Sequence, residues 1–589
     1  MMRSMQVALL ALLLLSAAIA QQPVINNGPL NAASVGFSRE GESGAGIAQG
    51  SMLIVKGQGL GTCGTVVATS FPLKTTMGAT SVKITIAGNS FNVLMYYVVA
   101  CSPNAPDQLA GIVPSNTPTG NGTITVTNNG RTSAPVPILI VARRFGIYAR
   151  NGNGTGPLIV QNFNSATDQP VNSLVESAHP GQSEILWGNG LGAINGDDSV
   201  PPPGGNMDIS VDVFVGGKAA DVAYKGRTVY PSVDVIVFKV PDGVQGCYVP
   251  VAVRVAGVLS NSGTISVTPS GKACSDPLGF SSADLQKVLD GGTLTVADLS
   301  LLRLSAKLAV TGLGNAQGNL DFGTGAFKRY GSAADLLKSV NRSSLGGVNF
   351  DNGMPIPSLG CVVTPFTSRG FLDDFNPGVD DDPVSIQRLD AGAALNLAGP
   401  LGAKQFPRTG GLSYDAPNDG LLGGGIAGLP GLPAPTPDYL VPGNYTFNNG
   451  SGAVVGGFST SLTIPGNPPV WTNQDAIANI PRSQDMTVTW SGGVPGSYVS
   501  IIGSSADPAT KAGAEFICTE RAEAGTFTVP SWILSAMPVS GADPSAGGTP
   551  DGFLTLQSTL PQAVRFQATG IDVGFFNWTL WQAKNVKYQ

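Results

Sequence analysis

The chain has 589 residues, of which 42% are hydrophobic and only 12% charged, with 79 glycines and 44 prolines. The hydrophobic share suffices to build cores, whereas the charged share is about half that of an average globular protein. A net charge of −6 without a basic stripe argues against nucleic acid and anionic membranes as partners.

Residues 1–20 have the pattern of a secretory signal peptide. Arg3 gives a short basic region, an apolar run extends from Val7 to Leu15, and Ala18-Ile19-Ala20 is a small-residue cleavage site. The apolar run is too short to span a membrane, and no second long run follows. We therefore expect a secreted protein without a transmembrane segment, located outside the cell, in the periplasm or on the cell surface.

An internal repeat follows, over residues 21–142 and 143–274. Val55-Lys56-Gly57-Gln58-Gly59-Leu60-Gly61 returns as Leu186-Trp187-Gly188-Asn189-Gly190-Leu191-Gly192. Four further blocks recur in the same order, among them Val113-Pro114 and its counterpart Val240-Pro241. Five ordered blocks indicate a duplicated domain.

Each repeat has the pattern of short strands. Val82, Ile84 and Ile86 alternate with Lys83 and Thr85, which predicts a strand with one buried face. Asn128-Asn129-Gly130 is a hairpin turn signal, because Asn and Gly tolerate positive φ. Strands of this length, separated by turns every eight to twelve residues or so, predict a β-sandwich.

The combined pattern resembles immunoglobulin-like domains of the IPT/TIG type, and more closely the secreted tandem Ig-like proteins common in soil acidobacteria. The resemblance spans residues 24 to about 268 and includes Asn31-Ala32-Ala33-Ser34 and the linker Phe145-Gly146-Ile147-Tyr148. It implies an Ig-like fold and an extracellular location. This chain departs from the family in its cysteines and in an insertion from Asp197-Asp198 to Pro203.

The second half of the chain does not continue the repeat. Residues 275–470 form a Gly- and Pro-rich β region with one short helix expected at 282–289, capped by Ser281 or Ser282. Residues 471–589 contain period-two strands that predict another sandwich. The expected fold class is mainly β: tandem Ig-like β-sandwiches, then a larger β-rich C-terminal region that includes a β-sandwich.

All six cysteines lie in the expected mature chain, which fits an oxidising compartment. Six cysteines allow fifteen pairings. The domain layout favours Cys63–Cys101, Cys247–Cys274 and Cys361–Cys518.

Catalytic motifs are scarce. His179 is the one histidine of the chain, and it lies in a predicted turn. No G-x-S-x-G or H-E-x-x-H motif occurs. The run from Gly57 to Gly61 lacks the spacing of a phosphate-binding loop, so we interpret it as a turn. We therefore predict that the protein is not an enzyme and needs no cofactor.

One acidic loop could hold a hard cation such as Ca²⁺. Its carboxylates are Asp373, Asp374, Asp380, Asp381 and Asp382. The spacing does not fit an EF-hand, and the alternative is a solvated acidic loop.

Five tryptophans lie late in the chain and allow two interpretations. They could form an exposed platform for sugars, or they could fill sandwich cores, as we expect for Trp490 in its alternating strand. The tryptophans are Trp471, Trp490, Trp532, Trp578 and Trp581.

Three functions remain open. The first is a secreted, non-catalytic surface protein that acts in adhesion or in protein or matrix binding, with the repeats as spacers. The second is a carbohydrate-binding protein that uses the C-terminal aromatic residues. The third is a hydrolase built from carboxylates within residues 275–589. The expected partner is a protein or glycan at the cell exterior.

Overall fold

The computed structural model describes residues 22–589 apart from 27, 35–45, 104, 151–153, 155–156, 275–280, 282, 285–286, 288–291, 311–313, 331–359, 368–385, 418–419, 428–434, 508–511, 544–548, 551 and 562. The proposed signal peptide and the acidic loop lie outside the described residues. No helix of the described part is long and apolar enough to cross a membrane.

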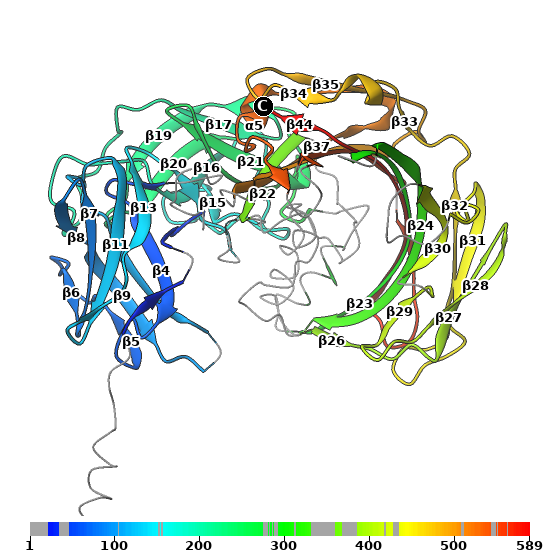
Figure 1. Ribbon diagram of the computed structural model, residues 1–589, viewed down its shortest axis with the longest axis horizontal. Coiled ribbons are helices and arrows are strands. Elements are labelled where there is room, and N and C mark those ends of the chain that lie inside the picture. Colours follow the sequence, from blue (N-terminus) through cyan, green and yellow to red (C-terminus); the bar gives the residue numbers. More distant parts are fainter. Residues whose placement is uncertain are drawn as a thin grey trace, which may run out of the picture.

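The first repeat is a sandwich of two sheets (Figure 1). Its core lies between them, where Leu53 and Val55 of one sheet meet Ile84 and Ile124 of the other. One sheet contains β1 (Val24–Ile25), β2 (Leu30–Asn31), β4 (Met52–Gln58), β5 (Gly64–Val67), β9 (Leu94–Ala100) and β10 (Asp107–Ile112). The other contains β3 (Ile47–Ala48), β6 (Thr76–Met77), β7 (Thr80–Ile86), β8 (Asn89–Asn92), β11 (Gly120–Asn128), β12 (Arg131–Thr132) and β13 (Val136–Val141).

The second repeat has the same strand order. One sheet contains β14 (Gly146–Ile147), β15 (Val160–Asn162), β16 (Ser183–Asn189), β19 (Val222–Arg227) and β20 (Asp234–Lys239). The other contains β17 (Val211–Val215), β18 (Lys218–Ala220), β21 (Gly246–Val255) and β22 (Val258–Val267). The order β4-β10-β9 returns as β16-β20-β19, and β13-β11-β7 returns as β22-β21-β17. The predicted tandem of Ig-like sandwiches is therefore confirmed.

The same two-residue turn closes the last hairpin of each repeat. Asn129 and Gly130 have φ of 49° and 76°, and Ala256 and Gly257 have φ of 48° and 84°. Positive φ at both positions matches the right-handed twist of the paired strands. The turn predicted at Asn128-Asn129-Gly130 is confirmed.

The C-terminal half is built on one 11-stranded sheet, called the large sheet below. Its long strands curve into an arc (Figure 1). It contains β23 (Leu294–Val310), β24 (Gly314–Tyr330), β25 (Gly360–Thr367), β26 (Ile386–Arg388), β29 (Ser413–Asp415), β30 (Leu421–Ala427), β36 (Tyr498–Asp507), β37 (Ala512–Arg521), β41 (Gly552–Thr559), β42 (Val564–Phe566) and β43 (Val573–Asn585).

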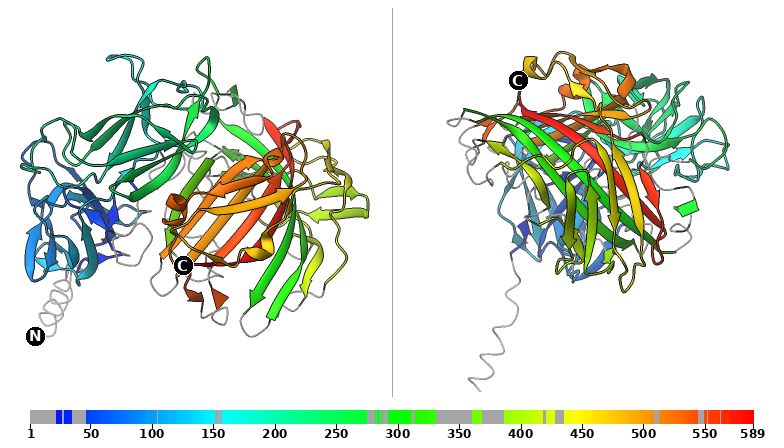
Figure 2. Two further views of the ribbon diagram at one scale, coloured as in Figure 1. Left: turned by 90° about the horizontal axis from the view of Figure 1, so that it is seen from above. Right: turned by 90° about the vertical axis from the view of Figure 1, so that its right-hand side faces the viewer.

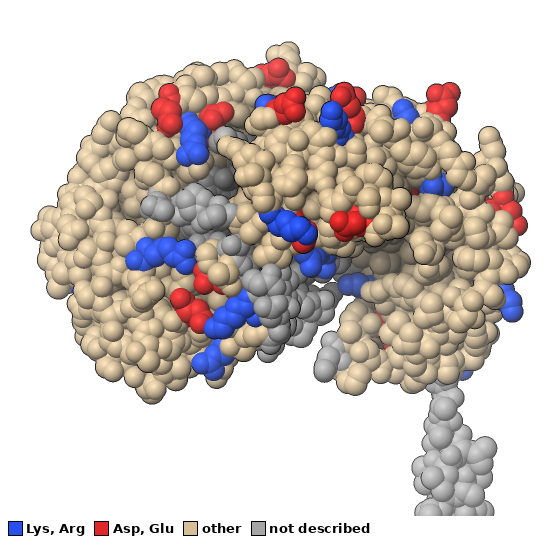
Figure 3. Space-filling model, turned by 180° about the vertical axis from the view of Figure 1, so that it is seen from behind, with Lys and Arg blue, Asp and Glu red and all other residues tan. Residues whose placement is uncertain are grey.

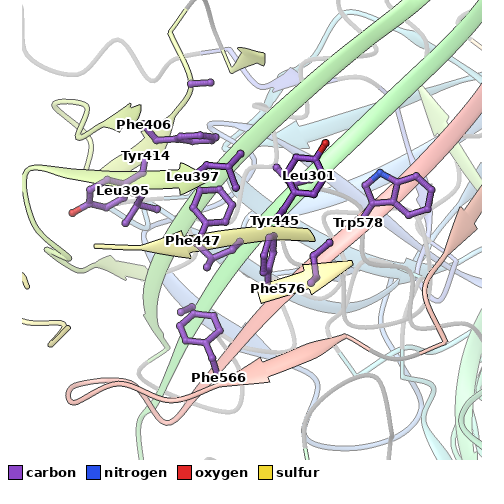
Figure 4. Close-up of a cluster of buried hydrophobic side chains, with 14 of the residues drawn as sticks. Leu301, Leu395, Leu397, Phe406, Tyr414, Tyr445, Phe447, Phe566, Phe576 and Trp578 are labelled. Atoms are coloured by element: carbon purple, nitrogen blue, oxygen red, sulfur yellow. The ribbon is translucent and has the colours of Figure 1, made fainter. Parts of the chain in front are cut away.

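Two smaller sheets cover the convex face of the arc, as Figures 1 and 2 show. The first contains β27 (Ala394–Gly399), β28 (Gly402–Pro407), β31 (Gly443–Asn448) and β32 (Ser459–Ile464); the second contains β33 (Val470–Trp471), β35 (Met486–Ser491) and β38 (Thr526–Val529). Under the first sheet, aromatic and aliphatic side chains such as Phe406, Phe447 and Phe576 interdigitate (Figure 4).

Short elements complete this unit. They are β34 (Asn479–Ile480) paired with β44 (Lys587–Tyr588), β39 (Ala542–Asp543) paired with β40 (Thr549–Pro550), the 3₁₀ turns η1 (Gln474–Ala476) and η2 (Ala522–Ala524), and the helix α5 (Ser531–Leu534).

The expected boundary at residue 470 does not separate two units. Strand β23 pairs in parallel with β43, from Val296 opposite Val573 to Lys307 opposite Lys584. Strand β25 pairs antiparallel with β37, which lies beyond residue 470. Residues 275–470 and 471–589 therefore share one sheet, because strands distant in sequence complete each other's hydrogen bonds.

The short helix expected at 282–289 begins as predicted. Residues 283, 284 and 287 are helical. Ser281 Oγ accepts a hydrogen bond from the Asp284 amide at 3.1 Å, and the Asp284 carboxylate accepts one from the Ser281 amide at 3.0 Å. This reciprocal arrangement is a capping box with Ser281 as the cap.

Candidate functional site

The repeated Gly-x-Gly-Leu-Gly motif has a structural role. Gly57 lies in β4 opposite Ile25 of β1, and Gly188 lies in β16 opposite Ile147 of β14. A Cβ atom on Gly57 would lie 2.0 Å from the Val24 carbonyl oxygen, and one on Gly188 would lie 2.2 Å from the Phe145 ring. Only glycine admits the preceding strand at this distance. The first Gly-x pair is therefore strand rather than turn, and the turn begins at the second glycine.

A buried aspartate stabilises this turn in each repeat. Asp107 Oδ2 accepts a hydrogen bond from the Leu60 amide at 2.9 Å. Asp234 Oδ2 accepts from the amides of Gly190 and Leu191 at 2.7 and 2.8 Å. The sequence carried this signal, since counting back from Val113-Pro114 and Val240-Pro241 places the two aspartates in register. Our sequence interpretation missed both.

Asp234 also belongs to a polar network between the repeats. Its side chain pairs with Arg227, which is 4% exposed. Arg227 Nη2 donates to the carbonyl oxygen of Gly50 in the first repeat at 3.0 Å. Asn189 makes two hydrogen bonds to Met52. Its side-chain oxygen accepts from the Met52 amide at 3.0 Å, and its side-chain nitrogen donates to the Met52 carbonyl oxygen at 2.8 Å. These contacts are buried, so they fix the repeats at one relative position.

The insertion that departs from the family pattern adds to the same junction. Asp198 accepts hydrogen bonds from the amide and the hydroxyl of Ser115, both at 2.7 Å. The Leu73 amide donates to the Ser199 carbonyl oxygen at 2.7 Å. The insertion in the second repeat thus holds two loops of the first.

A second junction joins the second repeat to the C-terminal unit. The rings of Phe214 in β17 and Trp532 in α5 stack with centroids 4.4 Å apart and planes 7° from parallel. The Arg254 guanidinium lies over the Phe214 ring, 5.3 Å from its centroid, and pairs with Asp212 at 2.9 Å. Stacked aromatic pairs add about 0.5–1.5 kcal/mol beyond the area they bury.

The tryptophans are mostly internal. Trp490 is 4% exposed, and its Nε1 donates to the Ala522 carbonyl oxygen at 2.7 Å, as its predicted core position requires. Trp471 and Trp578 are also buried, and Trp532 lies in the interdomain stack. Trp581 is partly buried and faces the concave side of the large sheet. The five residues do not form a shared exposed platform.

His179 has a structural contact. Its Nδ1 lies 2.8 Å from the Thr268 carbonyl oxygen, and its amide donates to Gln182 Oε1 at 2.9 Å. These bonds connect the segment before β16 to the end of β22. Within the described ranges, no group of three or more His, Cys, Asp or Glu side chains could hold a metal ion.

The structure contains three disulfides, which are the pairs that the domain layout favoured. Cys63–Cys101 and Cys247–Cys274 each lie within one repeat, and Cys361–Cys518 joins β25 to β37. Cys361 and Cys518 lie directly opposite each other in the large sheet.

Several carboxylates of the C-terminal unit form ion pairs. Asp321 pairs with Arg303 at 2.7 Å and accepts from the amides of Tyr439 and Leu440. Asp572 pairs with Lys287 at 2.5 Å beside a hollow of about 360 Å³ that Thr295 and Arg329 also line. With these lining residues the hollow offers no free pair of facing carboxylates. Figure 3 shows charged side chains of both signs scattered over the displayed face.

Comparison with known proteins gives distant structural similarity. No protein-family model and no curated protein sequence matches the chain. Domains 5–6 of the S-layer protein SbsC align at 12% identity and a TM-score of 0.15, covering 42% of this chain and 99% of that one. SGBP-B of the Bacteroides ovatus mixed-linkage glucan utilization locus, in complex with a mixed-linkage heptasaccharide, aligns at 11% identity and a TM-score of 0.11, covering 88% of this chain and 95% of that one. Immunoglobulin domains 1–5 of Sidekick-1 align at 10% identity and 0.11, covering 96% and 99%. The Ig-like assignment rests on the strand order described above.

Proposed function

We propose that this protein is a non-catalytic extracellular binding protein. In this proposal the two Ig-like domains hold the C-terminal unit in a fixed position, where it contacts a protein or glycan partner outside the cell.

The buried junction between the repeats carries the proposal. Arg227 donates a hydrogen bond to the Gly50 carbonyl oxygen. The side-chain amide of Asn189 accepts a hydrogen bond from the Met52 backbone amide and donates one to the Met52 carbonyl oxygen. A flexible spacer would not bury charged and amide groups at its joint, because each loses hydration that only a fixed geometry replaces. The joint therefore supports a rigid spacer.

Other observations support the extracellular location and the non-catalytic role in this proposal. Three disulfides fit an oxidising compartment. His179 is bonded to a backbone carbonyl, and Asp321 and Asp572 are held in ion pairs. These contacts leave the named groups poorly placed for acid–base catalysis, which requires access to substrate.

The test measures binding of the full chain to extracellular material from the organism that produces it. We expect saturable binding, together with no turnover above background in a broad glycosidase and esterase screen. The proposal would be contradicted if no saturable binding is observed, or if hydrolysis increases in proportion to the protein concentration.

A junction variant tests the spacer role. Asn189→Ala should loosen the repeats and weaken binding, whereas Gln58→Ala should not. Gln58 is the counterpart of Asn189 in the first repeat and is exposed at the end of β4. X-ray scattering should show a wider range of shapes for Asn189→Ala alone; identical scattering for both variants would refute a rigid joint.

A further inference from the structure

The hollow beside Asp572 lies at one end of the large sheet. Thr295 of β23 lies opposite Arg329 of β24, so the two side chains lie on the same face of the sheet. Thr295 is 7% exposed, whereas Thr293 is exposed, and so the hollow runs from the sheet surface out to solvent. Its volume is about 360 Å³, and the remaining lining residues are Lys287 and residues 570–572.

Asp572, the carboxylate among the lining residues, already has its partners. Its Oδ1 pairs with Lys287 Nζ at 2.5 Å. Its Oδ2 accepts hydrogen bonds from the amide and the hydroxyl of Thr295 at 2.7 and 2.6 Å. Burial alone would raise the pKa of Asp572, but these bonds outweigh burial and hold the pKa below its ordinary value. The charges of Asp572 and Lys287 therefore compensate each other at neutral pH.

Arg329 keeps a positive charge that no carboxylate compensates. Its Nη1 donates to Gln387 Oε1 at 3.0 Å, and this acceptor is neutral. Among the described residues Arg329 forms no ion pair. A guanidinium has five N–H donors in a fixed fork, so the edge formed by Nε and Nη2 remains available to a ligand. A carboxylate fits such an edge with two parallel hydrogen bonds.

The charge of the hollow favours a monoanion. Lys287 and Asp572 cancel, which leaves the one positive charge of Arg329. A carboxylate carries one negative charge, whereas a phosphate monoester carries about 1.5–2 at pH 7. A carboxylate-bearing ligand therefore neutralises the hollow, and a phosphorylated one leaves it with excess negative charge.

The other lining residues favour a sugar acid over an acidic peptide. Thr293 offers an exposed hydroxyl that both donates and accepts, and Ile571 offers partly buried apolar surface. A sugar ring presents hydroxyls and C–H groups to such a pair, whereas the side chain of Glu or Asp has no hydroxyl. A volume near the lower end of known ligand sites suits one sugar ring with its carboxylate.

We propose that this hollow binds a uronate residue of an acidic polysaccharide, with Arg329 bonding the carboxylate and Thr293 a ring hydroxyl. Because Thr293 and Gly570 are exposed at the rim, the ring can belong to a longer chain that continues outside the hollow. The site rests on the proposed binding role and names the class of its partner.

The test is calorimetric titration of the full chain with galacturonate and mannuronate trimers, with galactotriose as the neutral comparison. At least one acidic trimer should bind, and galactotriose should not. The affinity for the acidic trimer should fall as NaCl is raised, because salt screens the attraction between exposed charges.

Substitutions of Arg329 test the carboxylate contact. Arg329→Gln should weaken binding at least about tenfold, because it removes a charge-assisted pair of hydrogen bonds. Arg329→Lys keeps the charge but not the fork, so its affinity should be intermediate. The unfolding midpoint of Arg329→Gln should match that of wild type, since the bond to Gln387 is exposed. The matched control is Arg131→Gln in exposed strand β12 of the first repeat, which should bind like wild type.

A charge placed at the rim gives a second test. Thr293→Glu adds a carboxylate beside Arg329, so it should compete with the ligand for the guanidinium and repel it. Thr293→Gln has nearly the same size without the charge, and it should bind the acidic trimer more tightly than Thr293→Glu does. Equal affinities of these two variants would contradict a site that selects negative charge.

The proposal is overturned if neither acidic trimer binds, or if Arg329→Gln binds as tightly as wild type. It is also overturned if tetraglutamate or inorganic phosphate binds as tightly as the better trimer, since the ligand would then be an acidic peptide or a phosphorylated group. Undiminished binding of Arg329→Gln to extracellular material would overturn this site alone, whereas absence of saturable binding by wild type would overturn the binding role itself.

Discussion

Glu184 places a carboxyl group in the core of the second repeat, where the first repeat has Leu53. It is fully buried, and neither carboxyl oxygen has a hydrogen-bond partner. Burial raises the pKa of Glu184 to about 9. The residue therefore stays protonated in the folded protein at neutral pH, at the expense of stability.

We predict that this group makes stability fall as pH rises. The folded protein retains a proton that the unfolded chain releases above its ordinary pKa of 4.5. The stabilising effect of protonation is thus complete below about pH 4.5 and is lost between there and pH 9. Urea unfolding should show a loss on the order of 4 kcal/mol between pH 5 and pH 8 from this group.

Glu184→Leu should remove that pH dependence and raise stability at pH 8. The matched control is Glu176→Gln in the same repeat, whose carboxylate bonds exposed Lys272 at 2.8 Å; it should keep the wild-type slope. An unchanged slope in Glu184→Leu would show that other groups cause the pH dependence.

The two turn-stabilising aspartates should differ in importance. Asp107→Ala leaves the amides of Leu60 and Cys101 without their acceptor, which should cost about 1–3 kcal/mol. Asp234→Ala also leaves buried Arg227 unpaired, so its loss should reach about 3–5 kcal/mol. Urea unfolding at neutral pH measures both, and equal losses would argue against a role for the Arg227 pair.

At the scale of the element, the disulfide between β25 and β37 closes the longest loop. Cys361 and Cys518 are 157 residues apart, against 38 and 27 for the other two pairs. Loop entropy predicts that removing the long bridge costs about 5 kcal/mol and the shortest about 3.5 kcal/mol.

Paired cysteine-to-alanine variants and chemical unfolding check this prediction. The Cys247→Ala/Cys274→Ala variant serves as the reference. A smaller loss for Cys361→Ala/Cys518→Ala would show that the unfolded chain is already restrained in this region.

Strands with one buried and one solvent-exposed face were predictable from the sequence. The alternation of Val82, Ile84 and Ile86 with Lys83 predicts the burial pattern of β7, because period two reports directly on the face. The burial of β23 was not predictable, since residues 294–301 are buried although Asp298 and Ser300 alternate with Leu299 and Leu301. Such an alternation predicts an exposed polar face, whereas both faces of this stretch are covered.

Partners distant in sequence were not predictable. Nothing near Leu301 indicates that it lies beside Trp578, because register between strands is set by tertiary packing. The same limit applies to Thr559 of β41 and Thr579 of β43, because only the strand register places them opposite each other.

At the scale of the whole molecule, the contact between Phe214 and Trp532 should hold the C-terminal unit against the second repeat. Trp532→Ala should release it, and X-ray scattering should report a larger average size. Limited proteolysis should then cut faster between the two units.

The control for this variant is Tyr230→Ala, which removes an aromatic side chain of the same repeat that is 53% exposed. It should leave scattering and cleavage unchanged. If Trp532→Ala behaves like Tyr230→Ala, other contacts fix the two units.

The parallel pairing of β23 with β43 has a consequence in time. In the sheet β43 lies between β23 and β41. During synthesis β23 leaves the ribosome more than 260 residues before β43. Until then the edge of β23 that pairs with β43 has no partner strand, a state that invites wrong pairing. Correct assembly of this half must wait for its latest strands, so it depends on keeping this edge of β23 unpaired until translation has passed residue 585.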